Sequence, residues 1–158
     1  MLSQESLQKI DREIAKYPPD QKRSAVMAAL RIAQQEKRWL SGETLAFVAD
    51  YLGMPPVAVL EVASFYNMYE LKPVGEHKLT ICTNLSCSLS GALDVADYLK
   101  RKLGIGFDET TDDGRFTLKQ GECMGACGEA PVMLHNNHRM CCRMSRETID
   151  ALIEELSK

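Results

Sequence analysis

The sequence predicts an α+β protein in two parts: an N-terminal helical bundle over residues 1–72 and a mixed domain over residues 73–158. Two observations support this division. Up to Lys72, apolar residues recur at the three- and four-residue spacings of amphipathic helices. After Pro73, short apolar runs bounded by turn residues alternate with helical stretches. Pro73 and the nearby Gly75 mark the boundary between the parts.

The composition is that of an ordinary globular protein. Of 158 residues, 45% are hydrophobic and 26% are charged, and the formal net charge is −3. This balance argues against disorder, and the absence of a basic stripe with interleaved aromatics argues against nucleic-acid binding. The N-terminal stretch lacks the pattern of a secretory signal, and no apolar run reaches the roughly 20 residues of a membrane helix. We therefore expect a soluble chain in a reducing compartment.

Four helices are expected in the first part. Ser3, Asp20 and Ser41 are the expected N-caps of the first three. Pro56 suits the first turn of the fourth, which we expect to run to about Tyr69. Short amphipathic helices are marginal alone in water, so these must pack on one another or against a partner.

The second part is expected to alternate strand and helix. Its predicted elements are a strand at 77–82, a helix at 90–103, a strand at 115–120, a hairpin turning at Asn136 and Asn137, and a C-terminal helix capped by Ser145. Asparagine tolerates the left-handed conformation that a tight turn needs. The resulting order, β-α-β-β-β-α, is the core order of a thioredoxin-like domain.

Four of the six cysteines form two close pairs, Cys82 with Cys87 and Cys123 with Cys127. The helix between the pairs is a crossover, so the strands that precede them should run parallel. The carboxyl ends of parallel strands meet at one edge of a sheet, which brings the two pairs to one place. Each pair could then hold one iron, giving the four thiolates of a [2Fe–2S] cluster.

The pairs have other conceivable uses. Structural zinc also takes four cysteines, usually in pairs spaced C-x2-C to C-x4-C. The pairs here are spaced C-x4-C and C-x3-C, so a zinc site remains an alternative. A dithiol oxidoreductase would need C-x-x-C, which is absent. Small residues such as Gly125 and Ala126 let backbone N–H groups approach the sulfurs, which favours a cluster over buried inert thiols.

The remaining cysteines and the histidines are not expected to be ligands. Cys141 and Cys142 are adjacent on a predicted strand, so they point to opposite faces and cannot both line one site. His77, His135 and His138 could replace a thiolate as in Rieske centres. Because four cysteines already complete the ligand set, we interpret the histidines as strand-end or turn residues.

The motif C-T-x-x-x-C, followed further along by E-C-M-G-A-C-x-x-A-P, resembles the thioredoxin-like [2Fe–2S] subunit of NADH–quinone oxidoreductase, respiratory complex I. The stretches SFYNMY, DGRFTLKQGE and APVML are also similar to that family, and the resemblance covers nearly the whole chain. It implies a thioredoxin-like [2Fe–2S] ferredoxin domain, with the cluster held by Cys82, Cys87, Cys123 and Cys127. It also implies docking on the flavoprotein subunit that binds FMN and NADH, beside other peripheral-arm subunits.

The function that the resemblance implies is one-electron exchange between the cluster and the FMN of that partner. The complex would lie on the cytoplasmic side of a bacterial inner membrane, or on the matrix side in mitochondria. No P-loop and no G-x-G-x-x-G is present, so we expect no nucleotide or flavin site and no catalytic residue in this chain. The alternatives are the equivalent subunit of a soluble NAD-linked hydrogenase or formate dehydrogenase, a free ferredoxin, and a zinc-stabilised interaction module. Phe65 and Tyr66 suit a small core or a partner interface equally well.

Overall fold

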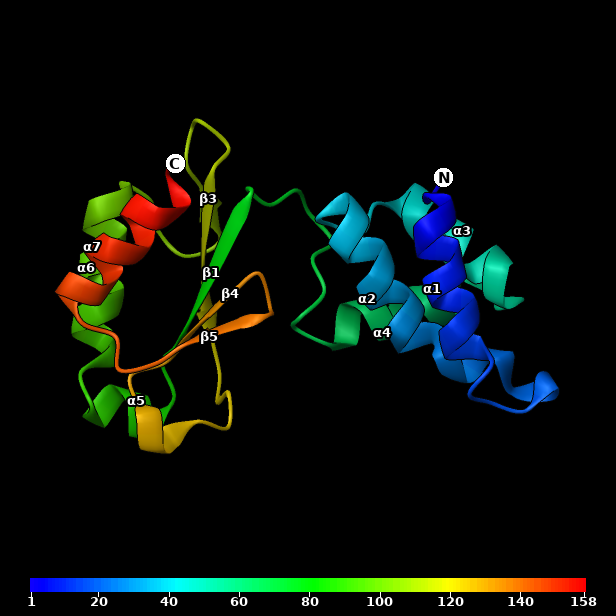
Figure 1. Cartoon of the computed structure of the whole chain (residues 1–158), viewed down its shortest axis with the longest axis horizontal. Helices are drawn as coiled ribbons and strands as arrows, with labels where there is room; N and C mark the ends of the chain where they lie inside the picture. The colour runs from blue at the N-terminus through cyan, green and yellow to red at the C-terminus, as the bar shows by residue number, and fades with distance from the viewer. The chain divides into compact units, whose positions relative to one another are not determined.

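The computed structural model describes all 158 residues, and the chain divides into two compact units, Met1–Pro73 and Val74–Lys158. Each unit has a hydrophobic core of its own. The first unit is all-helical, and the second combines a five-stranded sheet with helices (Figure 1).

The first unit contains α1 (Gln4–Ile14), the 3-10 helix η1 (Pro19–Ala25), α2 (Val26–Lys37), α3 (Gly42–Leu52) and α4 (Pro56–Phe65). Two of the predicted caps are confirmed. The Ser3 hydroxyl accepts a hydrogen bond from the Ser6 N–H at the start of α1, and the Ser41 hydroxyl accepts one from the Thr44 N–H at the start of α3. Such caps satisfy backbone donors that have no partner inside the helix.

Two boundaries in the first unit differ from the prediction. Asp20 does not cap α2; it lies within η1, whose backbone kinks at Gln21, and α2 begins at Val26. The fourth helix ends at Phe65 and not near Tyr69, because Tyr66 adopts an extended conformation with φ −94° and ψ 122°. The apolar pattern nevertheless continues past this end, which is why the sequence overestimates the length of the helix.

The segment after α4 packs back onto α2. The Tyr69 hydroxyl donates a hydrogen bond to the Met27 carbonyl at 2.8 Å. The Gln34 side chain donates to the Met68 carbonyl at 2.8 Å and accepts from the Glu70 N–H at 2.6 Å. These side chains fasten the end of the first unit to its second helix. No single helix of the chain is long and apolar enough to span a membrane; α3 and α4 reach that length and apolarity only together, across a bend of 120°.

The second unit contains β1 (His77–Cys82), α5 (Leu85–Leu89), α6 (Ala92–Leu103), β2 (Glu109–Thr110), β3 (Phe116–Gly121), the 3-10 helix η2 (Cys127–Glu129), β4 (Met133–His135), β5 (Arg139–Cys141) and α7 (Arg146–Leu156). The strand order is β2-β3-β1-β4-β5. β1 and β3 are parallel, as predicted, and the other pairs are antiparallel. Figure 1 shows α6 and α7 together on one face of the sheet, where their apolar residues complete the core.

The local predictions for this unit are largely confirmed. β1 has the expected bounds, and Asn136 and Asn137 both take positive φ in the β4–β5 turn. Ser145 caps α7, and its capping box includes Thr148. Two details differ. The expected helix at 90–103 is preceded by the short α5, with Gly91 in the left-handed conformation between α5 and α6, and the two-residue β2 was not foreseen.

Candidate metal centre

The two cysteine pairs leave the sheet from neighbouring strand ends. Cys82 is the last residue of β1 and stands opposite Gly121, the last residue of β3, in the parallel register. Cys87 lies in α5, immediately after β1. Cys123 follows β3, and Cys127 begins η2. The predicted meeting of the pairs at one edge of the sheet is therefore what the fold provides.

Hydrogen bonds join the two loops just beyond the strands. The Thr83 N–H donates to the Gly121 carbonyl at 3.0 Å, which extends the ladder by one residue. The Asn84 side chain then donates to the Glu122 carboxylate at 2.9 Å. These bonds connect residues that are distant in sequence, and they hold the first cysteine loop beside the second.

The two pairs are unequal in exposure. Cys82 and Cys87 are only 2% and 1% exposed, in a small apolar cluster with Ala92 and Val132. Cys123 and Cys127 are exposed. A group held by all four sulfurs would thus be covered by protein on one side and open to the surface on the other.

Backbone N–H groups are directed at the sulfurs. Burial raises the pKa of the Cys82 thiol, and the neighbouring Cys87 thiol raises it further, while hydrogen bonds from the Asn84 and Met124 N–H groups oppose the rise. The Gly125 N–H donates to Cys123 Sγ at 3.4 Å. Such donors favour thiolates and, around an iron–sulfur cluster, contribute to its reduction potential.

The donor set fits a two-iron cluster. Cys123 Sγ and Cys127 Sγ are 3.9 Å apart. A tetrahedral metal with metal–sulfur bonds of about 2.3 Å separates its sulfurs by about 3.8 Å, so this pair is spaced to share one metal. No three of the chain's histidine, cysteine and acidic side chains surround a single point. The four thiols form two pairs, and a [2Fe–2S] cluster takes two thiolates at each iron.

The remaining cysteines and two of the histidines lie at or next to strand ends. Cys141 is half-buried at the end of β5, and Cys142 is exposed. His77 begins β1, at the opposite end of that strand from Cys82, and its Nδ1 lies 3.1 Å from Nε2 of His135. The strand-end interpretation of these two histidines is correct, but their contact with each other has no signal in the sequence.

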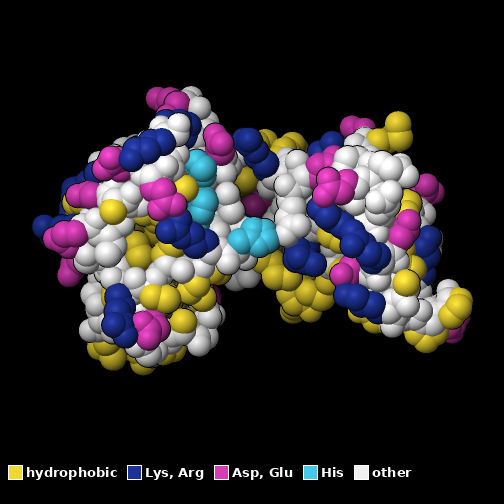
Figure 2. Space-filling view, in the orientation of Figure 1, with side chains coloured by type: hydrophobic (Ala, Val, Ile, Leu, Met, Phe, Trp, Pro, Cys, Tyr) yellow, Lys and Arg dark blue, Asp and Glu magenta, His cyan; other side chains and the backbone are white.

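Exposed leucines flank the buried pair. Leu85 and Leu89 of α5 are 71% and 81% exposed, and Leu93 at the start of α6 is 55% exposed. Figure 2 shows hydrophobic side chains gathered along the edge of the second unit where α5 lies. An apolar surface beside a ligand-bearing loop is typical of a protein contact.

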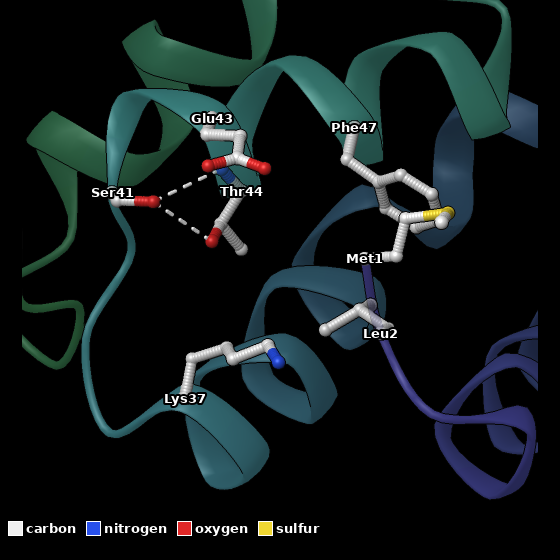
Figure 3. Close-up of a pocket in the computed structure, with 7 residues that line it drawn as sticks. All are labelled: Met1, Leu2, Lys37, Ser41, Glu43, Thr44 and Phe47. Carbon is white, nitrogen blue, oxygen red and sulfur yellow. Dashed lines mark hydrogen bonds between the residues drawn. The ribbon is translucent and has the colours of Figure 1, made fainter.

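The first unit contains a pocket of about 190 Å³. It is lined by Met1, Leu2, Lys37, Ser41, Glu43, Thr44 and Phe47. In Figure 3 the Ser41 hydroxyl is engaged by Thr44, as part of the α3 cap. This volume is below the roughly 300–1,000 Å³ of small-molecule sites, and no cysteine lines the pocket.

The chain is similar to known proteins in sequence and in fold. A family model described as thioredoxin-like [2Fe–2S] ferredoxin matches residues 10–157. NADH-quinone oxidoreductase subunit 2 of Thermus thermophilus is 40% identical over 147 residues, covering 93% of this chain and 81% of that protein. A subunit of the NADH-quinone oxidoreductase of Rickettsia felis is 41% identical over 145 residues, covering 91% and 86%.

A crystal structure of an NAD+-reducing [NiFe]-hydrogenase in the air-oxidized state is similar in fold, with a TM-score of 0.70 and 25% identity. The match covers 81% of this chain but only 22% of the hydrogenase chain. The predicted family is confirmed, and with it the [2Fe–2S] cofactor that the cysteine pattern indicates. The chain belongs to the thioredoxin-like [2Fe–2S] ferredoxin family.

Proposed function

We propose that this chain is the electron-transfer component of an NADH–quinone oxidoreductase, respiratory complex I. It exchanges one electron between a [2Fe–2S] cluster on Cys82, Cys87, Cys123 and Cys127 and the FMN of the NADH-oxidising partner subunit. The observation that carries the proposal is the meeting of two thiol pairs at the shared carboxyl edge of β1 and β3. The names of the relatives support the same role.

When bound, a [2Fe–2S] cluster supplies a centre that accepts and returns single electrons. Cys82 and Cys87 hold it from the buried side and exclude water there. Cys123 and Cys127 hold it from the exposed side, where a partner can approach. The Gly125 N–H stabilises negative charge on the sulfur to which it donates.

In this proposal the two parts of the chain have different roles. Residues 73–158 form the cluster domain, and the helical bundle of residues 1–72 is an assembly domain. The exposed apolar residues of α4 support the second role: Val57 is 61%, Leu60 45% and Phe65 80% exposed. Large apolar side chains left in water in this way are typical of a partner interface.

The proposed partners are the FMN- and NADH-binding flavoprotein subunit and other subunits of the peripheral arm. FMN and NADH belong to the partner, and this chain contributes neither a nucleotide site nor a catalytic residue. The complex is proposed to lie on the cytoplasmic side of the bacterial inner membrane, or on the matrix side in mitochondria.

The similarity to a hydrogenase structure favours one second candidate, the equivalent subunit of an NAD-linked hydrogenase. A formate dehydrogenase of the same organisation belongs to this alternative. Both candidates keep the same cluster and the same exchange with a flavin, and they differ in the neighbouring subunits. Purification of the chain from its native source under mild conditions separates them by the subunits that accompany it.

The ligand assignment is tested by replacing each cysteine with serine in the full chain and reconstituting the cluster anaerobically. The proposal predicts lost iron and lost visible absorption for changes at the four ligands. Cys141→Ser and Cys142→Ser are the matched controls and should load normally. Normal loading of Cys123→Ser, or failed loading of a folded Cys142→Ser, contradicts the assignment.

A further inference from the structure

Gly121 is the point at which the second cysteine loop leaves the sheet, and it has no room for a side chain. A Cβ built there would lie 2.7 Å from Cγ2 of Thr80 and 2.9 Å from Cε of Met124. Thr80 is on the neighbouring strand β1, and Met124 is within the loop itself. The missing side chain of Gly121 is therefore what allows Met124 to fold back onto the sheet beside Thr80.

Met124 is the large apolar side chain of this loop that packs against the rest of the unit. Glu122, Cys123 and Cys127 are exposed or open to solvent, whereas Met124 is half-buried. It packs against the small apolar cluster that contains the buried thiols Cys82 and Cys87. One residue of the exposed loop thus contacts the cluster that contains the buried pair through its side chain.

Met124 occupies the space that a side chain at Gly121 would take, beside Thr80. We propose that it is a positioning residue that holds the exposed Cys123–Cys127 loop against the buried Cys82–Cys87 pair. The inference rests on the proposed function, because it concerns how the four thiols come to hold one cluster. Met124 itself binds no iron. It acts by fixing where the two exposed thiols stand.

The direction of the expected effects follows from this geometry. Met124→Ala removes the anchor, so the loop and its two thiols move more freely and the cluster is lost more easily. Changes in the groups that position metal ligands typically cost about 10- to 100-fold in affinity, so we expect cluster loss at least about tenfold faster. A loop that moves more freely weakens the hydrogen bond from the Gly125 N–H to Cys123 Sγ, which then stabilises the reduced, more negative cluster less, so the reduction potential becomes more negative. Met124→Leu keeps an apolar anchor of similar volume and should restore both properties.

Gly121→Ala should act through Met124. Threonine is stiff at χ1 and Thr80 sits within a strand, whereas the methionine end is flexible, so the added methyl displaces Met124 first. Once Met124 is alanine, the added methyl has less to displace. The clash of the added methyl with Thr80 remains in the double variant Gly121→Ala/Met124→Ala, but its clash with Met124 is gone. The double variant should therefore lose its cluster more slowly than the two separate effects combined would predict.

Two other glycines provide controls. Gly128 lies in the same loop region, but a Cβ there meets nothing within 4 Å. Gly128→Ala should leave the cluster unchanged. Gly75 lies before β1, and a Cβ there would be 2.9 Å from the carbonyl oxygens of Gly114 and Arg115. Gly75→Ala should lower the melting temperature of the chain without changing the potential or the electron paramagnetic resonance (EPR) spectrum of the reduced cluster.

The experiment compares the full-length variants after anaerobic reconstitution. The rate at which an iron chelator bleaches the cluster, the midpoint potential and the EPR spectrum of the dithionite-reduced chain are measured for each. Faster bleaching, a more negative potential and an altered spectrum in Met124→Ala, with recovery in Met124→Leu, support the inference. Wild-type values for Met124→Ala in all three overturn it, as do fully additive effects of Gly121→Ala and Met124→Ala on the bleaching rate.

The series does not depend on one fragile variant. If Gly121→Ala fails to fold, the comparison of Met124→Ala with Met124→Leu still decides the matter. A wild-type chain that takes up no [2Fe–2S] cluster overturns the proposed function as well. An intact wild-type cluster that is indifferent to Met124→Ala overturns only the positioning role.

Discussion

Cys82 and Gly121 end two parallel strands directly opposite each other, so the two cysteine loops leave the sheet side by side. Beyond them, the Asn84 side chain donates to Glu122 and ties the loops together. The first pair is buried and the second is exposed. The site therefore has a protected inner side and an accessible outer side, and this asymmetry has measurable consequences.

The first prediction concerns the reactivity of the thiols. In the cluster-free chain, Cys123, Cys127 and Cys142 should be alkylated quickly, because they are exposed. Cys82 should react slowly, because it is buried and burial raises the pKa of its thiol. Peptide mapping by mass spectrometry after timed exposure to iodoacetamide gives the order.

Loading the cluster should protect Cys123 and Cys127 but not Cys142, which serves as the internal control. Alkylation of Cys82 as fast as that of Cys123 in the cluster-free chain contradicts the asymmetry. Protection of Cys142 on loading contradicts the ligand assignment.

The sequence predicted those parts of the fold that depend on local chemistry. The turn at Asn136 and Asn137 is an example, because two residues that tolerate positive φ separate two short apolar runs. The end of α4 was misjudged, because Tyr66 leaves the helix while the apolar pattern continues. The cap at Asp20 was misjudged because the chain there forms a 3-10 helix that begins at Pro19.

The four cysteines proposed as ligands can be predicted from the sequence, because paired cysteines after strands are a local signal. The contacts of Gly121 with Thr80 and Met124, and of Asn84 with Glu122, were not readable. They depend on the register of two parallel strands separated by a crossover, and register is a property of the folded sheet.

A second prediction concerns pH. His135 has a lowered pKa, because it is partly buried and because the nearby His77 and Arg139 disfavour its protonation. His138 acts in the same direction and Glu155 opposes them. The folded pKa is below the ordinary value of 6.5, so the unfolded chain binds more protons as the pH falls. The contribution of His135 to the free energy of unfolding is therefore fully present above about pH 6.5 and is lost as the pH falls below it.

The midpoint of thermal unfolding should accordingly fall between about pH 7.5 and about pH 5, and His135→Gln should reduce this slope. His138→Gln changes another histidine of the same hairpin and should leave the slope nearly as it is. An identical pH dependence in wild type and His135→Gln would argue against the assignment to His135.

A third prediction separates assembly from stability in the helical unit. Phe65 is 80% exposed, so Phe65→Ala should change the free energy of unfolding by less than about 0.5 kcal/mol. If Phe65 is an anchor in the partner interface, the same change should weaken binding to the flavoprotein subunit by about 2 kcal/mol, or about 30-fold.

Tyr69→Phe is the matched control. It removes the hydroxyl that donates to the Met27 carbonyl at 2.8 Å, so the free energy of unfolding should fall by about 1 kcal/mol. Binding to the partner should remain unchanged, because Tyr69 is buried within its own unit. Chemical denaturation and titration calorimetry measure the two quantities. Undiminished partner affinity in Phe65→Ala would remove this residue from the proposed interface.

The central claim is that this chain exchanges electrons with a flavin on a partner and does not itself oxidise NADH. Hydride transfer from NADH moves two electrons together and belongs to a nicotinamide–flavin pair, whereas a [2Fe–2S] cluster takes one. The most direct test is stopped-flow measurement of the cluster's visible absorption after mixing with NADH, for the chain alone and for the chain bound to its FMN-containing partner. Dithionite serves as the control that the cluster is reducible in both samples. The proposed function predicts no bleaching by NADH in the isolated chain, and rapid bleaching in the complex provided that the cluster's midpoint potential is within reach of NADH. Rapid bleaching by NADH in the isolated chain, or none in a complex whose cluster has a midpoint potential above that of NADH, would contradict it.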